Sequence, residues 1–133
     1  MSIRVVVDTN VLVSAFLTKN PLSPTARIYR SILAGEVIPL ISDEIIDEYK
    51  DVLHRAKFKF NPDDVDAAIA YIELIGEYLF PVDSDEDFID PEDKVFYCTA
   101  LAGEAYLVTG NIKHYPQSAI VITPSEFCEI HGL

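Results

Sequence analysis

The chain begins with a β-branched apolar run, Ile3 to Val7, that ends directly on the carboxylate of Asp8. A run of this kind is typical of a buried strand. A carboxylate beside it is costly to bury unless a partner or a cation compensates its charge. In parallel α/β sheets, sites form at the carboxyl ends of the strands. This segment therefore predicts a buried strand that delivers an acid to the functional edge of a sheet.

Segments that favour strands and helices alternate along the rest of the sequence. Further strands are expected at 37–41, 105–109 and 119–122, and helices at 10–17, 24–34, 43–55, 62–79, 91–103 and from 124 onward. Capping signals mark the helix starts, namely Ser23-Pro24, Ser42, Asn61-Pro62 and the capping box Thr123-Pro124-Ser125-Glu126. The alternation predicts one α/β domain over residues 1–133, with a parallel β-sheet flanked by helices as an α/β/α sandwich.

The charge balance limits the classes of function. The chain has 22 acids against 10 bases and a formal net charge of -12. A general nucleic-acid coat needs a basic footprint and is therefore disfavoured. A nuclease is not excluded, because a local acid cluster can bind cations while a few bases hold phosphates. An acidic surface could also attract a basic partner.

The two cysteines, Cys98 and Cys128, each stand alone in a helix-like segment. No spacing typical of a zinc site is present, and reduced thiols are the simplest interpretation. Neither a signal peptide nor a transmembrane segment is evident, because the apolar N-terminus is interrupted by Asp8 and Asn10. We therefore expect a cytoplasmic protein.

Three carboxylates occupy positions that a purely structural role explains poorly. Asp8 could be a helix N-cap, but its place at a strand end favours a functional role. Glu48 falls on the apolar face of its helix, whereas Asp47 points outward, unless Glu48 is a border residue that reaches water. Asp90 and Asp93 could form a capping box, yet they would also be well placed at the sheet edge to hold a cation.

A fourth element is the turn Thr109-Gly110-Asn111, which ends the strand expected at 105–109. Gly and Asn favour turns in any case. If this strand end lies beside that of Asp8, Asn111 would offer a neutral oxygen ligand and Thr109 a hydroxyl. Hard oxygen ligands of this kind suit Mg²⁺ or Mn²⁺ rather than zinc.

Taken together, these elements resemble the PIN-domain nucleases, and in particular the toxin members of bacterial and archaeal toxin–antitoxin pairs (VapC-like). The family opens with a strand that ends in Asp, usually followed by a small or hydroxyl residue and Asn, and Asp8-Thr9-Asn10 matches it. Glu48 matches its helical Glu, and Asp93 matches its Asp at the start of a helix rich in small and apolar residues. Thr109-Gly110-Asn111 matches its fourth position.

The resemblance extends from residue 3 to about residue 127, with one departure. Many PIN nucleases carry Asp at the fourth position, where this chain has Asn111. The turn is followed by His114 and Tyr115, which is similar to a variant among toxin-type members. This departure weakens the expectation of a second metal ion more than it weakens the expectation of catalysis.

The resemblance implies an enzyme, a Mg²⁺- or Mn²⁺-dependent ribonuclease that hydrolyses RNA phosphodiesters. Asp8 and Asp93 are then expected to bind the metal directly or through water, with Glu48 either as a ligand or as the group that orients the attacking water. Asn111 is expected to be a further ligand. The supporting residues are Thr9, Asn10, Asp90 and Thr109.

Expected partners are an RNA substrate, a cognate antitoxin protein and, in a homodimer, a second copy of the chain; no membrane is expected. Bases interleaved with aromatics could hold single-stranded RNA by charge and stacking. They could equally be solvated bases around a buried Phe pair. The candidates for this weaker RNA-binding role are Arg27, Arg30, Arg55, Lys57 and Lys59.

Two other functions remain as alternatives. In an aspartyl-phosphate phosphatase Asp8 would be the nucleophile, but such sites usually have a second Asp two residues later, where this chain has Asn10. A catalytically inert PIN-fold module that binds RNA or protein would fit the acidic charge and Asn111. The presence of Asp8, Glu48 and Asp93 argues against it, because an inert fold has no need of three clustered acids.

Overall fold

The structure is a computed structural model that describes residues 3–133. Strands and helices alternate, as the sequence predicts. The strands are β1 (Ile3–Val7), β2 (Val37–Ile41), β3 (Glu77–Tyr78), β4 (Tyr106–Val108) and β5 (Val121–Ile122). The α-helices are α1 (Thr9–Leu17), α2 (Pro24–Leu33), α3 (Asp43–Leu53), α4 (Pro62–Ile75), α5 (Lys94–Gly103) and α6 (Pro124–His131). Short 3₁₀ turns occupy Ala56–Phe58, Pro91–Asp93 and Ile112–His114.

The five strands form one parallel sheet in the order β3-β2-β1-β4-β5. The chain builds outward from β1 through β2 to β3, and then returns to add β4 and β5 on the other side. The strand order therefore reverses between β1 and β4, which is where open α/β sheets place their sites. Val7 pairs with Val108 in the register of these two strands. Asp8 and Thr109 consequently leave the sheet side by side.

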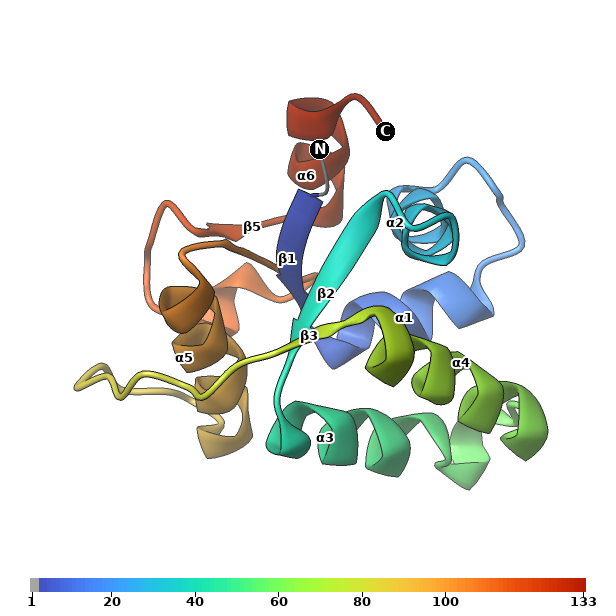
Figure 1. Ribbon diagram of the computed structural model, residues 1–133, viewed down its shortest axis with the longest axis horizontal. Coiled ribbons are helices and arrows are strands. Elements are labelled where there is room, and N and C mark those ends of the chain that lie inside the picture. The colour runs from blue at the N-terminus through green and yellow to red at the C-terminus, as the bar shows by residue number, and fades with distance from the viewer. Residues whose placement is uncertain (1–2) are drawn as a thin grey trace.

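Helices cover both faces of this sheet (Figure 1). Helix α5 packs on β1, β2 and β4 from one side, while α2 and α4 pack on β2 from the other. Helix α1 packs against α2, and α6 also packs against α2. Helix α3 follows β2 directly and contacts α1, α4 and α5. It thus lies at the carboxyl edge of the sheet, where Asp8 also emerges.

The central strands are buried on both faces, which explains why they read as nearly continuous apolar runs. Val5, Val6 and Leu40 have no exposed surface. They belong to one core cluster that also includes Tyr49 of α3 and Phe96 of α5. The predicted α/β/α architecture is thereby confirmed.

The predicted caps account for the helix starts. Ser23 accepts a hydrogen bond from the amide of Ala26, and Ser42 accepts one from Ile45. Asn61 caps α4, and Thr123 forms the expected reciprocal capping box with α6. Each cap satisfies amides that have no partner within the helix.

Two expected boundaries are wrong. The helix expected over 62–79 ends at Ile75, and residues 77–78 form the edge strand β3 instead. Gly76 adopts an extended conformation there and packs closely on Pro39 and Ile41 of β2. The helix expected from residue 91 begins as a 3₁₀ turn, and α5 starts at Lys94. Helix α4 ends early because residues 77–78 pair with β2, and helical periodicity in the sequence cannot predict such pairing.

Cys98 in α5 and Cys128 in α6 are both buried and free of disulfide bonds. Among the helices of residues 3–133, none combines the length and the apolar character that crossing a membrane requires.

Replacing Gly76 by Ala should destabilise the fold through overpacking alone. A Cβ at this position would lie 2.6 Å from the backbone oxygen of Ile72 and 3.0 Å from that of Pro39. Neither backbone atom can move easily, so the free energy of unfolding should fall by about 1–3 kcal/mol. Urea unfolding measures the change. Leu74→Ala, at a side chain that is 80% exposed, is the control and should stay within about 0.5 kcal/mol of the parent.

Candidate active site

Asp8 is the centre of a hydrogen-bonded site at the junction of β1 and α1. It stands at the N-cap position, but its side chain makes no capping bond. Its Oδ2 atom instead accepts hydrogen bonds from Thr109 Oγ1 at 2.8 Å, Tyr115 Oη at 3.0 Å and Asn10 Nδ2 at 3.2 Å. The residue is only 5% exposed. The structural alternative, an ordinary N-cap, therefore does not describe this carboxylate.

Burial dominates the electrostatics of Asp8. It raises the pKa of the carboxyl above its ordinary value, and the bonds from Thr109 and Tyr115 oppose that rise only in part. The three donors are neutral, so none of them cancels the charge. A buried carboxylate in this state still favours a nearby cation.

Asn10 and Thr109 join the ends of β1 and β4. Asn10 Nδ2 also lies 3.3 Å from Thr109 Oγ1, and Asn10 Oδ1 accepts a bond from the amide of Gly110 at 2.9 Å. Thr109 Oγ1 accepts from the amide of Asn111 at 3.0 Å. The expected meeting of Asp8 with the Thr109 turn is thus present. The side chain of Asn111 is exposed and makes no hydrogen bond within the described residues.

Thr9, the other supporting residue at this junction, begins α1. It is buried, and its hydroxyl oxygen has no hydrogen-bond partner among residues 3–133. Its side chain makes no hydrogen bond to the carboxylates in this structure, whereas its backbone amide helps to lower the pKa of Asp8.

Asp93 is the second acid of the site. It precedes α5, and its side chain makes no capping bond; Asp90 alone caps the 3₁₀ turn by accepting from the amide of Glu92 at 3.0 Å. The Oδ2 atom of Asp93 is buried without a hydrogen-bond partner in the described chain. Nδ1 of His114 lies 3.5 Å from this oxygen. The capping-box alternative for Asp93 is therefore wrong.

Asp8 and Asp93 are close enough to affect one another. Burial raises the pKa of Asp93 to about 6, with further increases from the charges of Asp8 and Asp90, while His114 lowers it in part. Two carboxylates that repel in this way hold a proton or a cation between them more readily than isolated ones.

Glu48 lies on the partly buried side of α3, as predicted, between exposed Asp47 and buried Tyr49. Burial raises its pKa, and the charges of Glu92 and Asp90 raise it further. Its carboxylate has no hydrogen bond or ion pair within residues 3–133. Glu48 is thus coupled to the segment that carries Asp93 rather than to Asp8.

We tested whether these acids suit a divalent metal ion. No group of three or more His, Cys, Asp or Glu side chains among the described residues is already gathered as a metal cage. Mg²⁺, however, usually keeps several waters and binds through only one or two carboxylates. Asp8 and Asp93 supply such a set, because the buried Oδ2 of Asp93 makes no hydrogen bond and has only His114 Nδ1, at 3.5 Å, as an ion-pair neighbour. The residues present therefore fit a hard divalent cation.

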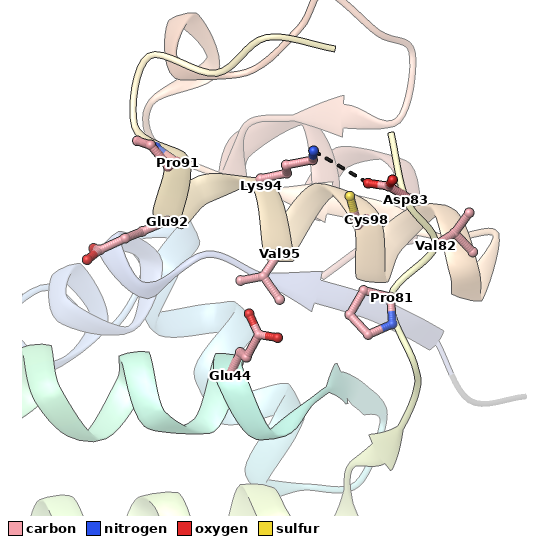
Figure 2. Close-up of a pocket in the computed structure, with 9 residues that line it drawn as sticks. All are labelled: Glu44, Pro81, Val82, Asp83, Pro91, Glu92, Lys94, Val95 and Cys98. Carbon is pink, nitrogen blue, oxygen red and sulfur yellow. Dashed lines mark ion pairs between the residues drawn. The ribbon is translucent and has the colours of Figure 1, made fainter. Parts of the chain in front are cut away.

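A groove of about 300 Å³ lies beside the site between α3 and α5. Figure 2 shows Glu44 of α3 and Val95 of α5 facing one another across it. Lys94, the one base among its lining residues, is engaged with Asp83 at 3.4 Å. Because Glu44 and Glu92 add further negative charge, this groove is a poor path for a polyanion.

The predicted basic residues are not gathered around the acids. Arg27 donates to the backbone oxygen of Leu133 at 2.8 Å, and Arg30 donates to that of Pro21. Both line a cavity near the end of α2 that includes Glu36, just before β2 begins, and so lie toward the opposite edge of the sheet from Asp8. The expected RNA-binding role for Arg27 and Arg30 has no support in this arrangement. Arg55 pairs with Asp51 at 2.9 Å.

Lys57 and Lys59 remain exposed and lie in a segment with two aromatic rings. The rings of Phe58 and Phe60 stack at 5.5 Å, and Lys57 Nζ lies 5.0 Å from the Phe58 centroid. Phe60 is also packed edge-on against Phe16 of α1. This segment is the surviving candidate for contact with a single strand, because stacking and positive charge occur together.

The sequence did not single out Tyr115 as a site residue. It is buried, and burial, followed by the charges of Asp8 and Asp93, raises the pKa of its hydroxyl. The one feature of the sequence that pointed to Tyr115 was its position shortly after the Thr109 turn. A buried tyrosine with its hydroxyl on a carboxylate 107 residues earlier cannot be distinguished by sequence alone from an ordinary core aromatic.

A family model described as a PIN domain matches residues 4–113 of the chain. The match includes Asp8, Glu48, Asp93 and Asn111. No curated protein and no solved structure matches the chain.

The raised pKa of Asp93 predicts how stability depends on pH in the metal-free protein. Its value of about 6 lies above the ordinary 3.8, so the folded chain binds this proton more tightly than the unfolded chain does. The free energy of unfolding should therefore fall as the pH rises through this window, on the order of 1–2 kcal/mol, and stay lower above it.

Urea unfolding in chelator at several pH values measures this dependence. Asp93→Asn should flatten it, whereas Asp47→Asn, at an exposed neighbour of Glu48, should not. An unchanged slope in Asp93→Asn would show that the carboxyl ionises as freely in the folded chain as in the unfolded one.

Proposed function

The chain belongs to the PIN-domain family, and from that premise we propose that it is a Mg²⁺- or Mn²⁺-dependent endoribonuclease. PIN domains are generally nucleases, so a hydrolase acting on nucleic acid is the activity that the family supports. One observation carries the proposal for this chain. Asp8 lies where the strand order reverses, and Asp93 is near enough for the charge of Asp8 to raise its pKa; the buried Oδ2 of Asp93 makes no hydrogen bond and has His114 Nδ1 at 3.5 Å.

The residues at this edge have different roles in the proposed reaction. Asp8 and Asp93 hold the divalent ion, and Asp8 is itself held by Thr109 and Asn10. When bound, such an ion makes a neighbouring water more acidic and offsets negative charge on the phosphate. Asn111 offers a neutral oxygen at the end of the turn.

Glu48 fits a water-orienting role better than a direct ligand role. Burial raises its pKa, which makes it a stronger proton acceptor than an exposed carboxylate, and its side chain has no hydrogen bond or ion pair in the described chain. It is coupled to Glu92 and Asp90 rather than to Asp8. Lys57 and Lys59, with the stacked ring of Phe58, are the groups proposed to hold the RNA strand.

We further propose that this nuclease is the toxin of a type II toxin–antitoxin pair. The support is the series of Asp8-Thr9-Asn10, Glu48, Asp93 and the Thr109-Gly110-Asn111 turn, which resembles toxin-type members. Its partners would be an antitoxin and a second copy of the chain. The free thiols of Cys98 and Cys128 suit the reducing cytoplasm in which such a pair acts. A small gene for a DNA-binding protein immediately upstream would be direct support.

An inert PIN module is the competing proposal. It predicts that the acids are structural remnants with ordinary environments. Asp8 instead is buried, Asp93 is partly buried, and burial raises the pKa of both carboxyls. Metal binding and cleavage separate the two proposals.

Purified protein should cleave labelled RNA in millimolar Mg²⁺ or Mn²⁺ and lose this activity in excess EDTA. Asp8→Asn should lower cleavage to background, because it keeps the size of the side chain but removes its charge. The thermal midpoint of the metal-free variant should be equal or higher, since a buried repulsive charge is gone. Cleavage that persists undiminished in EDTA would contradict the metal mechanism.

Glu48→Ala should lower cleavage by about 100-fold or more, the usual contribution of a proton-transfer group. Asp47→Ala is the matched control and should be nearly neutral, because Asp47 is exposed on the other side of the helix. Both variants are assayed for cleavage and for Mn²⁺ binding by calorimetry. Equal losses of cleavage in the two variants would mean that the position of Glu48 on the partly buried face of α3 does not explain its effect on cleavage.

A further inference from the structure

We propose that Tyr115 is a positioning residue that fixes Asp8 through Oδ2 and so presents Oδ1 to the divalent ion; the inference rests on the proposed function. The hydroxyl of Tyr115 donates to Asp8 Oδ2 at 3.0 Å. The residue follows the 3₁₀ turn Ile112–His114 and lies just beyond the span that matches the family.

The three donors to Asp8 are not equivalent. Thr109 Oγ1 also interacts with Asn10 and with the amide of Asn111, and Asn10 divides its amide between two acceptors. Tyr115 directs its hydroxyl to the carboxylate alone. It also approaches from outside the β1–β4 junction, whereas Thr109 and Asn10 are part of that junction. Tyr115 therefore contributes a constraint that the other two do not duplicate.

The convergence of donors determines which oxygen is left for a cation. An ionised carboxylate offers about two lone-pair sites on each oxygen. Three side-chain donors already crowd Oδ2, while no side-chain donor reaches Oδ1 within the described chain; the one further donor near the carboxylate is the backbone amide of Thr9. A carboxylate fixed in this way can offer one oxygen in one orientation. Groups that orient metal ligands in this manner commonly affect metal affinity almost as strongly as the ligands do.

The acidic loop that leads to Asp93 holds the ring of Tyr115. Phe88 packs edge-on against Tyr115 with centroids 6.2 Å apart, and against Tyr97 of α5 at 5.7 Å. The neighbours of Phe88 on this loop are exposed, Ile89 at 76% for example. Phe88 is thus the anchor of a segment that supplies one acid, Asp93, and steadies the residue that orients the other.

The test compares two tyrosines that each lose one buried hydroxyl bond. Tyr115→Phe removes the bond to the Asp8 carboxylate, and Tyr49→Phe removes the bond from Tyr49 to the backbone oxygen of Val7. Both keep the ring. Mn²⁺ affinity is measured by calorimetry on the full chain, and RNA cleavage is measured as a function of Mn²⁺ concentration.

Tyr115→Phe should bind Mn²⁺ about tenfold more weakly or worse, as expected for a lost orienting bond, and Tyr49→Phe should bind like the parent. Cleavage by Tyr115→Phe should fall at low Mn²⁺ and recover toward the parental rate when Mn²⁺ is raised. Thermal melts in chelator check that both variants are folded.

The outcomes distinguish the inference from the function on which it rests. If the parent binds Mn²⁺ and cleaves RNA but Tyr115→Phe binds Mn²⁺ equally well, Tyr115 packs the core and does not position Asp8. An equal weakening in both tyrosine variants would also overturn the inference, because the effect would then be structural. A parent protein that neither binds Mn²⁺ nor cleaves RNA overturns the proposed function together with the inference.

Discussion

The carboxylate of Asp8, buried at the junction of β1 and β4, is the constraint around which this end of the molecule is organised. Burying a charged oxygen among apolar strands is unfavourable unless polar groups surround it. Asn10 of α1 provides one of those groups, and Thr109 and Tyr115, on the segment that follows β4, provide the others. Satisfying one acid thus ties the first helix to the last third of the sequence. An apolar residue at position 8 would need none of these contacts.

Asp8 and Asp93, the two acids at this edge, have different surroundings. Asp8 is held by three neutral donors, whereas Asp93 has a buried oxygen with no hydrogen bond and only His114 nearby. Such an arrangement favours binding of a cation at the edge. The cation would compensate the buried oxygen of Asp93 that has no hydrogen bond, and the hydrogen bonds that hold Asp8 would stay in place.

Much of this arrangement follows from local sequence rules. The caps at Ser23 and Ser42 fix helix starts, and the helical period separates Asp47 from Glu48. The meeting of Asp8 with the Thr109 turn follows from the geometry of adjacent parallel strands. Contacts between segments that are distant along the chain could not be predicted from the sequence. The hydroxyl of Tyr115 reaches Asp8 only because the turn after β4 folds back, and β3 exists only because two residues after Gly76 pair with β2. The location of Arg27 and Arg30 could not be predicted for the same reason, since side-chain charge alone does not tell which edge of a sheet it faces.

The sheet ends on both sides in strands of only two residues, β3 (Glu77–Tyr78) and β5 (Val121–Ile122). A long exposed edge offers a row of free amides and carbonyls on which another chain can add a strand, and proteins commonly avoid aggregation by keeping such edges short. Neither border of this sheet has the length to template intermolecular β-pairing. Self-association of this molecule would therefore use the outer faces of its helices and leave the sheet, together with the acidic site at its carboxyl edge, within each subunit.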